Sequence, residues 1–238
     1  MTTRTPIDSL PFHDLLIVDI GGTVASGYAG KLYADYGARV VNLEPPEGFS
    51  TRHIAPLLDN GTSAIHAYLH AHKQSVCCTD SVLTHPATLA ADLVILDVST
   101  LPTSLAVDDF DTNVCAISWY GLTGPYAGFR GSDASIHALT GLMHGIGETD
   151  GPPIIPTGYQ AQVIGGLSAF NGSLGFLLGH LLVAQETSDP FCLDASIWEA
   201  NMCLTDIGAA ISFNDQPMPK RLGINRFAPT YPLGIWPC

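Results

Sequence analysis

Short runs of apolar residues recur along the first half of the chain, separated by glycine-rich turns and by segments with helical spacing. The runs are nearly continuous rather than alternating, which is typical of strands buried on both faces of a parallel sheet. After the first run, aromatic and apolar side chains recur on one side of a helix, at Tyr28, Leu32, Tyr33 and Tyr36. This alternation of strands and helices predicts an α/β fold built on a doubly wound parallel sheet. The expected strands cover residues 15–20, 39–44, 75–79, 93–98 and 114–119.

The longest apolar segment covers residues 161–185, and its length alone would suffice to cross a membrane. An asparagine, a histidine, serines and several glycines within it argue instead for a helix packed in a core. We expect Gly172, Gly175 and Gly179 to allow a neighbouring element to approach this helix closely. The segment therefore predicts a core helix and no membrane partner.

The pattern becomes irregular towards the end of the chain. A strand is predicted at 191–196 and a helix at 197–213, and both are followed by a proline-rich stretch. We therefore expect one domain over residues 1–213 and an irregular connector over residues 214–238.

Composition narrows the classes of partner. The chain has 238 residues, of which 46% are hydrophobic and 13% are charged, so it can bury one large core. A formal net charge of −13 argues against nucleic acid and against anionic membrane surfaces. The six cysteines have no metal-site spacing, and no apolar segment follows a basic start. We expect reduced thiols and a cytoplasmic location.

Basic side chains are scarce. Between Lys73 and Lys220 the sequence contains one cation, Arg130. A polyanionic ligand would therefore depend on Arg39, Arg52, Lys73 or Arg130, or on backbone N–H groups at a helix start.

Two local motifs suggest other functions. The segment D-I-G-G-T at residues 19–23 resembles the phosphate loop of actin-like sugar kinases, but helical spacing follows it where those kinases have a hairpin. His66 and His70 are four residues apart and could share a metal, yet no third ligand follows with suitable spacing. We expect neither a kinase nor a metal site.

A glycine-rich stretch from Ser118 to Gly175 carries a more specific signal. It reads S-W-Y-G-L-T-G-P-Y-A-G-F-R-G-S-D, then T-G-L-M, then G-E-T-D-G-P-P. Residues 19–52 add D-I-G-G-T-V-A-S-G-Y-A-G-K-L-Y-A-D-Y-G-A-R-V-V-N-L-E-P-P-E-G-F-S-T-R. Both stretches resemble the large domain of family III CoA-transferases, which include formyl-CoA transferase, carnitine CoA-transferase and α-methylacyl-CoA racemase.

The resemblance implies a Rossmann-like domain that binds coenzyme A and acts on acyl-CoA thioesters, with no metal. The family's motifs, matched to this sequence, imply CoA-binding residues in four places. These are a position shortly after Gly48, two loops, and the end of one strand. The residues are Arg52, His72, Lys73, Gln74, Asp97, Gly131, Ser132 and Asp133.

The resemblance also locates the position of the family's nucleophile. Its transferases attack the thioester with an aspartate, and that position here is Gln162, whose amide is a far poorer nucleophile. The histidine of the racemases is replaced by Ser132. We expect Asp133 to lie too far along the chain to replace the missing carboxylate, so the chain alone should lack transferase activity.

Three functions remain open on this basis. The first is an acyl-CoA transferase chain that works in a larger assembly, and the second is a catalytically silent CoA-binding or scaffolding subunit. The third, a racemase- or isomerase-like CoA enzyme, is disfavoured because both proton carriers are replaced.

The resemblance covers the first half of the family's length and lacks the family's small domain. It implies a homo- or hetero-oligomer with a similar chain. We also expect an exposed apolar tail that a partner would cover, formed by Tyr231, Leu233, Ile235 and Trp236.

Overall fold

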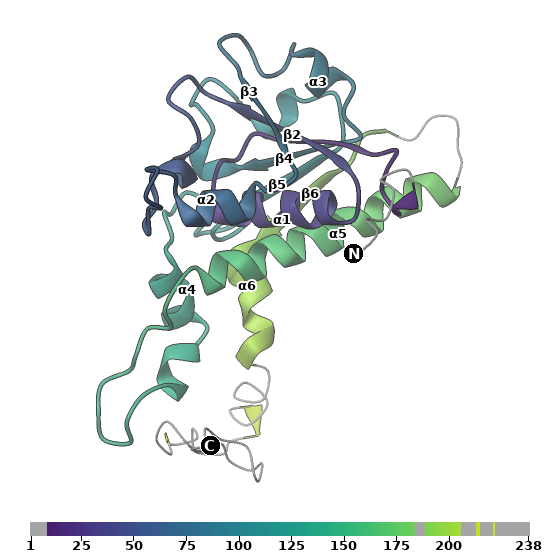
Figure 1. Cartoon of the computed structure of the whole chain (residues 1–238). Helices are drawn as coiled ribbons and strands as arrows, with labels where there is room; N and C mark the ends of the chain where they lie inside the picture. The colour runs from purple at the N-terminus through teal and green to yellow at the C-terminus, as the bar shows by residue number, and fades with distance from the viewer. Residues whose placement is uncertain (1–8, 184–188, 206–212, 215–220, 222–238) are drawn as a thin grey trace.

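A six-stranded, wholly parallel sheet forms the centre of the molecule (Figure 1). The computed structural model describes residues 9–183, 189–205, 213–214 and 221. The strand order is β3-β2-β1-β4-β5-β6. The strands are β1 (Leu16–Asp19), β2 (Arg39–Glu44), β3 (Gln74–Cys77), β4 (Leu93–Asp97), β5 (Val114–Ser118) and β6 (Cys192–Ser196). The α/β fold and the parallel strands predicted from the sequence are confirmed.

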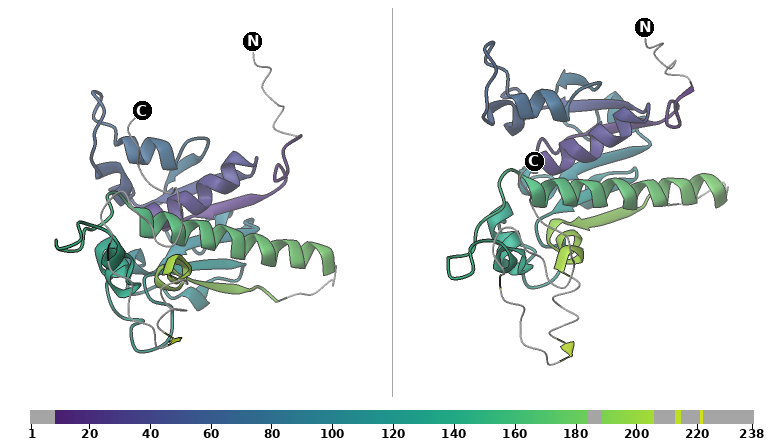
Figure 2. Two further views of the ribbon diagram at one scale, coloured as in Figure 1. Left: turned by 90° about the horizontal axis from the view of Figure 1, so that it is seen from below. Right: turned by 60° about the horizontal axis from the view of Figure 1, so that its bottom comes forward.

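Long helices cover one face of the sheet, and one short helix, 3-10 turns and loops cover the other. Two long helices, α1 (Val24–Asp35) and α5 (Gln160–Val183), lie side by side along one face, as Figures 1 and 2 show. The remaining α-helices are α2 (Ala64–Leu69), α3 (Pro86–Leu89), α4 (Asp133–Leu139) and α6 (Ile197–Met202). Short 3-10 turns cover Ser50–His53, Val98–Thr100, Val107–Asp109, Leu142–Gly145 and Cys203–Thr205.

Alternation along the strands divides the core in two. Ile17, Ile95 and Ile117 point to the layer of α1 and α5, where they pack with Tyr33 and Phe170. Their strand neighbours point to the opposite layer, around Leu43 and Phe110. These neighbours are Val18, Val94, Leu96 and Ala116. The central strands β4 and β5 are buried at every position, and they read as nearly continuous apolar runs.

Close packing of α5 depends on one of the expected glycines and on two others. The expectation for Gly172 is confirmed, because a Cβ there would lie 2.9 Å from Leu193 on β6. A Cβ at Gly166 would lie 2.4 Å from the carbonyl oxygen of Ala25 on α1, and one at Gly165 would lie 2.7 Å from Ile197. Gly175 and Gly179 have no neighbour within 4 Å, so the expectation for these two positions is wrong. Glycine therefore allows α5 to touch α1 near the start of both helices.

Over residues 160–180, α5 has the length and apolar composition of a membrane span. Here it packs against α1, α6, β5 and β6.

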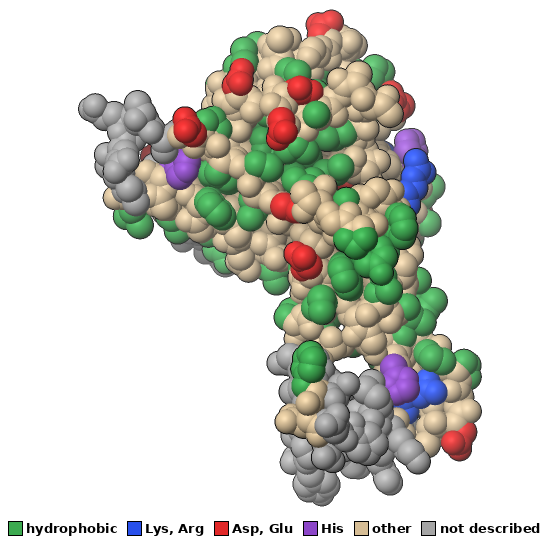
Figure 3. Space-filling model, turned by 180° about the vertical axis from the view of Figure 1, so that it is seen from behind, with side chains coloured by type: hydrophobic (Ala, Val, Ile, Leu, Met, Phe, Trp, Pro, Cys, Tyr) green, Lys and Arg blue, Asp and Glu red, His purple; other side chains and the backbone are tan. Residues whose placement is uncertain are grey.

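Figure 3 shows the surface of the molecule from behind, opposite to the view of Figure 1. Apolar side chains gather near the centre of this face among scattered acidic ones, while Lys and Arg side chains lie near its margin.

Part of the C-terminal expectation cannot be compared with the structure. The helix expected at 197–213 is described as α6 and a 3-10 turn up to Thr205. Most of the connector at 214–238, including the four apolar residues of the expected tail, lies outside the described residues.

Candidate functional site

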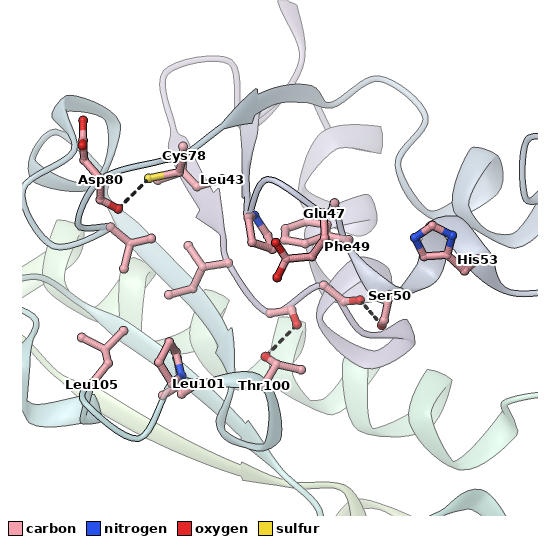
Figure 4. A pocket seen from close by; sticks show the side chains of 17 residues that line it. Leu43, Glu47, Phe49, Ser50, His53, Cys78, Asp80, Thr100, Leu101 and Leu105 are labelled. Atoms are coloured by element: carbon pink, nitrogen blue, oxygen red, sulfur yellow. Dashed lines mark hydrogen bonds between the residues drawn. The ribbon is translucent and has the colours of Figure 1, made fainter.

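A cavity of about 680 Å³ opens at the carboxyl ends of β1, β2, β3 and β4 (Figure 4). The sheet order reverses between β1 and β4, since β2 and β3 lie on one side of β1 and β5 and β6 lie beyond β4. Open α/β sheets bind ligands at such a switch point. We refer to this hollow as the carboxyl-edge cavity.

Hydrogen bonds fix the loops that form its walls. Gly22 has a φ of +63° and packs on Phe49, whose ring carbon would lie 2.5 Å from a Cβ at that position. Ser50 Oγ donates to Gly22 O at 2.9 Å, and Thr100 Oγ1 donates to Gly21 O at 2.9 Å, as Figure 4 shows. The turn between β1 and α1 is thus held from both sides, and its glycines leave room for a ligand.

The lining of the cavity is apolar and weakly acidic. Leu43, Leu101 and Leu105 contribute most of the apolar wall that Figure 4 labels, and Glu47 and Asp80 contribute carboxyl groups. Among the described lining residues there is no lysine or arginine, and His53 is the one basic type. The volume is sufficient for a nucleotide-sized ligand, whereas the negative charge of the lining does not favour phosphate groups.

Lys73 does not line this cavity. Its side chain is fully buried, with Nζ 3.3 Å from Asp19 Oδ2 and 2.9 Å from Gly27 O. Burial lowers the pKa of Lys73, and the Asp19 carboxylate opposes that shift. In this arrangement the ammonium holds β1, α1 and β3 together and is not offered to a ligand.

Two histidines extend this polar cluster, His66 on α2 and His70 at the C-cap of that helix. Their rings lie 4.3 Å apart, and Thr51 Oγ1 lies 2.9 Å from Nδ1 of His66 and 3.3 Å from Nε2 of His70. Burial, with Lys73 and His66 nearby, lowers the pKa of His70 to about 2. Within the described residues no group of side chains could hold a metal ion.

Arg52 pairs with Glu44 through two nitrogens, Nε and Nη2, each 2.6 Å from a carboxylate oxygen. Burial opposes ionisation of Glu44, but hydrogen bonds from Arg52, Ser75 and the Phe49 backbone outweigh it and lower the pKa to about 2. The Arg52 side chain remains 42% exposed next to Gly48, which lines the cavity. Of the predicted cations, Arg52 lies nearest to the carboxyl-edge cavity.

Asp97 is buried behind the wall of the cavity. It accepts hydrogen bonds from Thr23 Oγ1 at 2.9 Å and from Ser99 N at 2.9 Å. Burial raises its pKa, and these bonds oppose the rise. Asp97 therefore ties the start of α1 to the end of β4.

His72 and Gln74 lie at the opposite end of the strands from the cavity, where β2 and β3 begin. They line a second hollow, of about 730 Å³, with Arg39 at the start of β2. Gln74 accepts a hydrogen bond from Arg39 Nε at 3.1 Å. The structure does not bring these two predicted residues together with the carboxyl-edge cavity.

The glycine loop ends at a contact that the sequence did not predict. Asp133 Oδ2 accepts from Gln162 Nε2 at 2.9 Å, and Oδ1 accepts from the backbone N–H groups of Ala161 at 2.9 Å and Gln162 at 3.3 Å. The expectation that Asp133 lies too far from position 162 is wrong, because α4 and α5 converge at their N-terminal ends. Ser132 precedes it as the exposed N-cap of α4, and Gly131 fits under the ring of Trp119.

The first turns of α1 and α5 connect this contact with the carboxyl-edge cavity. Gly21 and Gly22 line the cavity, and α1 begins directly after them. Ala25, in the first turn of α1, touches α5 at Gly166, close to the end that carries Gln162. The cavity and the Asp133–Gln162 pair therefore lie on the two sides of the start of α1.

The family model for CoA-transferase family III matches residues 12–79 and 114–238, which is most of the chain. This chain belongs to CoA-transferase family III. The crystal structure of a CaiB/BaiF family protein from Brucella suis superposes with a TM-score of 0.79 at 25% identity, over 92% of this chain and 62% of that one.

Curated relatives in the family are named as CoA-transferases. The succinyl-CoA:glutarate CoA-transferase of Mus musculus is 27% identical over 87% of this chain and 50% of that protein. The succinate–glutarate CoA-transferase of Agrobacterium fabrum is 27% identical over 89% of this chain and 55% of that protein. This family III chain spans about half the length of these relatives. Two further relatives are named as subunits, one of a succinyl-CoA–L-malate and one of a succinyl-CoA:(R)-benzylsuccinate CoA-transferase.

Motif matching in this family III chain missed most of the lining of the cavity. Leu43 lies near the end of β2, and the other labelled side chains of Figure 4 come from segments that follow β2, β3 and β4. The available signal was position, since the carboxyl ends of parallel strands meet at one edge of a sheet. The motif around Lys73 instead marks a buried ion pair.

Proposed function

We propose that this chain forms the large, CoA-binding domain of a family III CoA-transferase that acts on acyl-CoA thioesters. In this proposal CoA occupies the carboxyl-edge cavity, with its adenine against the apolar wall. The thioester passes the first turn of α1 and reaches the Asp133–Gln162 pair. The observation that carries the proposal is that α1 begins at the cavity and that its first turn touches α5 at Gly166, one turn of α5 after Gln162.

The length of the relatives supports an assembly larger than this chain. The chain spans about half of the curated transferases it matches, and some relatives are named as subunits. We therefore propose that the active site is completed by further chain or by a partner of the same family, as a homo- or hetero-oligomer.

The charge of the cavity affects how CoA would bind there. Glu47 and Asp80 repel phosphate groups, and Arg52 is neutralised in part by Glu44. Favourable contacts to CoA would come from the apolar wall and the exposed edge of Arg52. We therefore expect weak binding, in which contacts with adenine and the pantetheine arm count for more than phosphate contacts.

A second candidate function is a silent subunit that binds CoA or scaffolds an active partner. The observation in its favour is Gln162, since an amide at the position of the family's nucleophile does not form an acyl-enzyme. On this alternative the chain would bind acyl-CoA without converting it.

Calorimetry on the full-length protein with CoA, acetyl-CoA and succinyl-CoA tests the proposal. Leu105→Trp should fill the carboxyl-edge cavity and weaken binding by about tenfold or more, a cost of about 1.4 kcal/mol. Leu89→Trp is the matched control, because Leu89 is 71% exposed on α3 and does not line the cavity. Absence of binding, or equal weakening by both variants, would reject the proposal. Transfer from succinyl-CoA to short carboxylic acids, followed by mass spectrometry, separates an active chain from a silent one.

A further inference from the structure

The Asp133–Gln162 pair places a carboxylate where the sequence alone indicates none. The two residues are 29 positions apart, and their side chains are held at 2.9 Å by a hydrogen bond. Both residues are half-buried, so a bound thioester can reach them. We propose that Asp133 supplies the nucleophilic carboxylate of this site and that Gln162 orients it. This inference rests on the proposed function.

The two oxygens of Asp133 have different surroundings. Oδ1 accepts two backbone N–H groups at the start of α5, which fixes the carboxylate on that helix. Oδ2 accepts one hydrogen bond, from Gln162 Nε2, and a carboxylate oxygen has capacity for more than one. Oδ2 is therefore the oxygen that is free to attack a carbonyl carbon.

The amide of Gln162 has a second N–H besides the one that binds Asp133. Once the first is given to Oδ2, the second points away from that oxygen and is available to an incoming carbonyl oxygen. A donor fixed in this way stabilises the negative charge that develops when a nucleophile adds to a thioester. The residue that looks like a lost nucleophile thus becomes a positioning group and an oxyanion donor.

The chemistry balances without an additional reagent. Asp133 Oδ2 adds to the thioester carbonyl carbon, the carbon–sulfur bond breaks, and the CoA thiolate leaves with the electron pair. The product is a mixed anhydride between the acyl group and Asp133. The thiolate then adds to the γ-carbonyl of Asp133, the anhydride bond breaks, and the acyl group leaves as a free carboxylate. An acceptor carboxylate runs the two steps in reverse.

Trapping of the covalent intermediate tests this assignment. The full-length protein is incubated with an acyl-CoA that binds it in calorimetry and is then quenched with hydroxylamine. Peptide mass mapping should find a hydroxamate at Asp133 in the wild type. A bound acyl-CoA that leaves no hydroxamate at Asp133, or one on another residue, overturns the inference while the proposed function stands. If no acyl-CoA binds, the proposed function fails first.

Two variants separate chemistry from folding. Asp133→Asn keeps an Oδ1 acceptor for the backbone N–H groups of α5, so it should fold, bind CoA and lose the hydroxamate. Asp150→Asn makes the same change on an exposed acidic turn and should retain the hydroxamate. Gln162→Ala should slow adduct formation by about 100-fold or more with little change in CoA affinity, as for loss of an oxyanion donor. An unchanged rate in Gln162→Ala would remove Gln162 from the mechanism.

Discussion

The ammonium of Lys73 lies 3.3 Å from the carboxylate of Asp19, and both side chains are completely buried. Removing one partner of a buried ion pair leaves an uncompensated charge, which typically costs about 3–5 kcal/mol. We expect Lys73→Met to lower the free energy of unfolding by about this amount. Asp19→Asn combined with Lys73→Met should recover part of the loss, because the amide keeps an acceptor for Gly21 N. Urea denaturation measures the free energy of unfolding of both variants. A Lys73→Met variant as stable as the wild type would contradict the role assigned to this pair.

This pair also changes how binding data on Lys73 should be interpreted. The family resemblance places Lys73 among the CoA-binding residues, which would predict weaker CoA binding in Lys73→Ala. The Lys73 side chain is buried and does not line the carboxyl-edge cavity. We therefore expect Lys73→Ala to reduce CoA binding only because less of the protein is folded. Calorimetry corrected for that fraction should give wild-type affinity.

Two glycines on α5 should respond to alanine in opposite directions. Gly166→Ala places a Cβ 2.4 Å from the carbonyl oxygen of Ala25, and the backbone must move to relieve the clash. We expect a loss of about 1–3 kcal/mol. Gly175→Ala meets open space on the same helix and should gain about 0.5–1 kcal/mol from helix propensity. Thermal unfolding of the two variants checks the prediction, and equal shifts would contradict the close contact of α1 with α5.

The acidic lining of the carboxyl-edge cavity predicts that CoA binds more tightly when negative charge in the cavity is removed or screened. We expect Glu47→Gln to tighten CoA binding, because it removes a carboxylate that repels phosphate groups. Added salt should tighten wild-type binding for the same reason, since it screens repulsion. Glu148→Gln is the matched control, as Glu148 is exposed and outside the cavity lining. Calorimetric titrations that weaken with salt, or respond equally to both variants, would show that attractive phosphate contacts dominate.

The ion pair of Arg52 with Glu44 should give stability an acid-sensitive component. The folded pKa of Glu44 is about 2, below its ordinary 4.5, so its contribution is complete above about pH 4.5 and is lost as the pH falls towards 2. Arg52→Gln should therefore cost about 1–2 kcal/mol at neutral pH, because Arg52 is partly exposed and solvent screens the pair. The difference from wild type should shrink below pH 4.5.

Urea denaturation across this pH range provides the test. Arg39→Gln is the control, since Arg39 is exposed and bonds to the exposed side chain of Gln74. Its effect should be small and constant with pH. A pH-independent difference for Arg52→Gln would exclude Glu44 as the titrating partner.

The sequence by itself determined the sheet. The predicted strands agree with β1 to β5 within one or two residues at each end. For β4 and β5 the reason is that strands buried on both faces are apolar almost throughout, whereas the exposed edge strand β3 carried a weaker signal. The family motifs likewise identified the glycine turn after β1 and the glycine loop before α4. These features are local, so neighbouring residues contain the information that specifies them.

Only the tertiary structure decided which polar groups meet. Lys73 and Asp19 are 54 residues apart, and Asp133 and Gln162 are 29 apart, on elements whose contact depends on how α1, α4 and α5 pack. Sequence spacing cannot tell a lysine that faces phosphate from one that neutralises a buried carboxylate. It also cannot tell that the carboxylate missing at position 162 is held beside it by Asp133. Such contacts follow from the burial of apolar faces over the whole domain, and local pattern does not encode that burial.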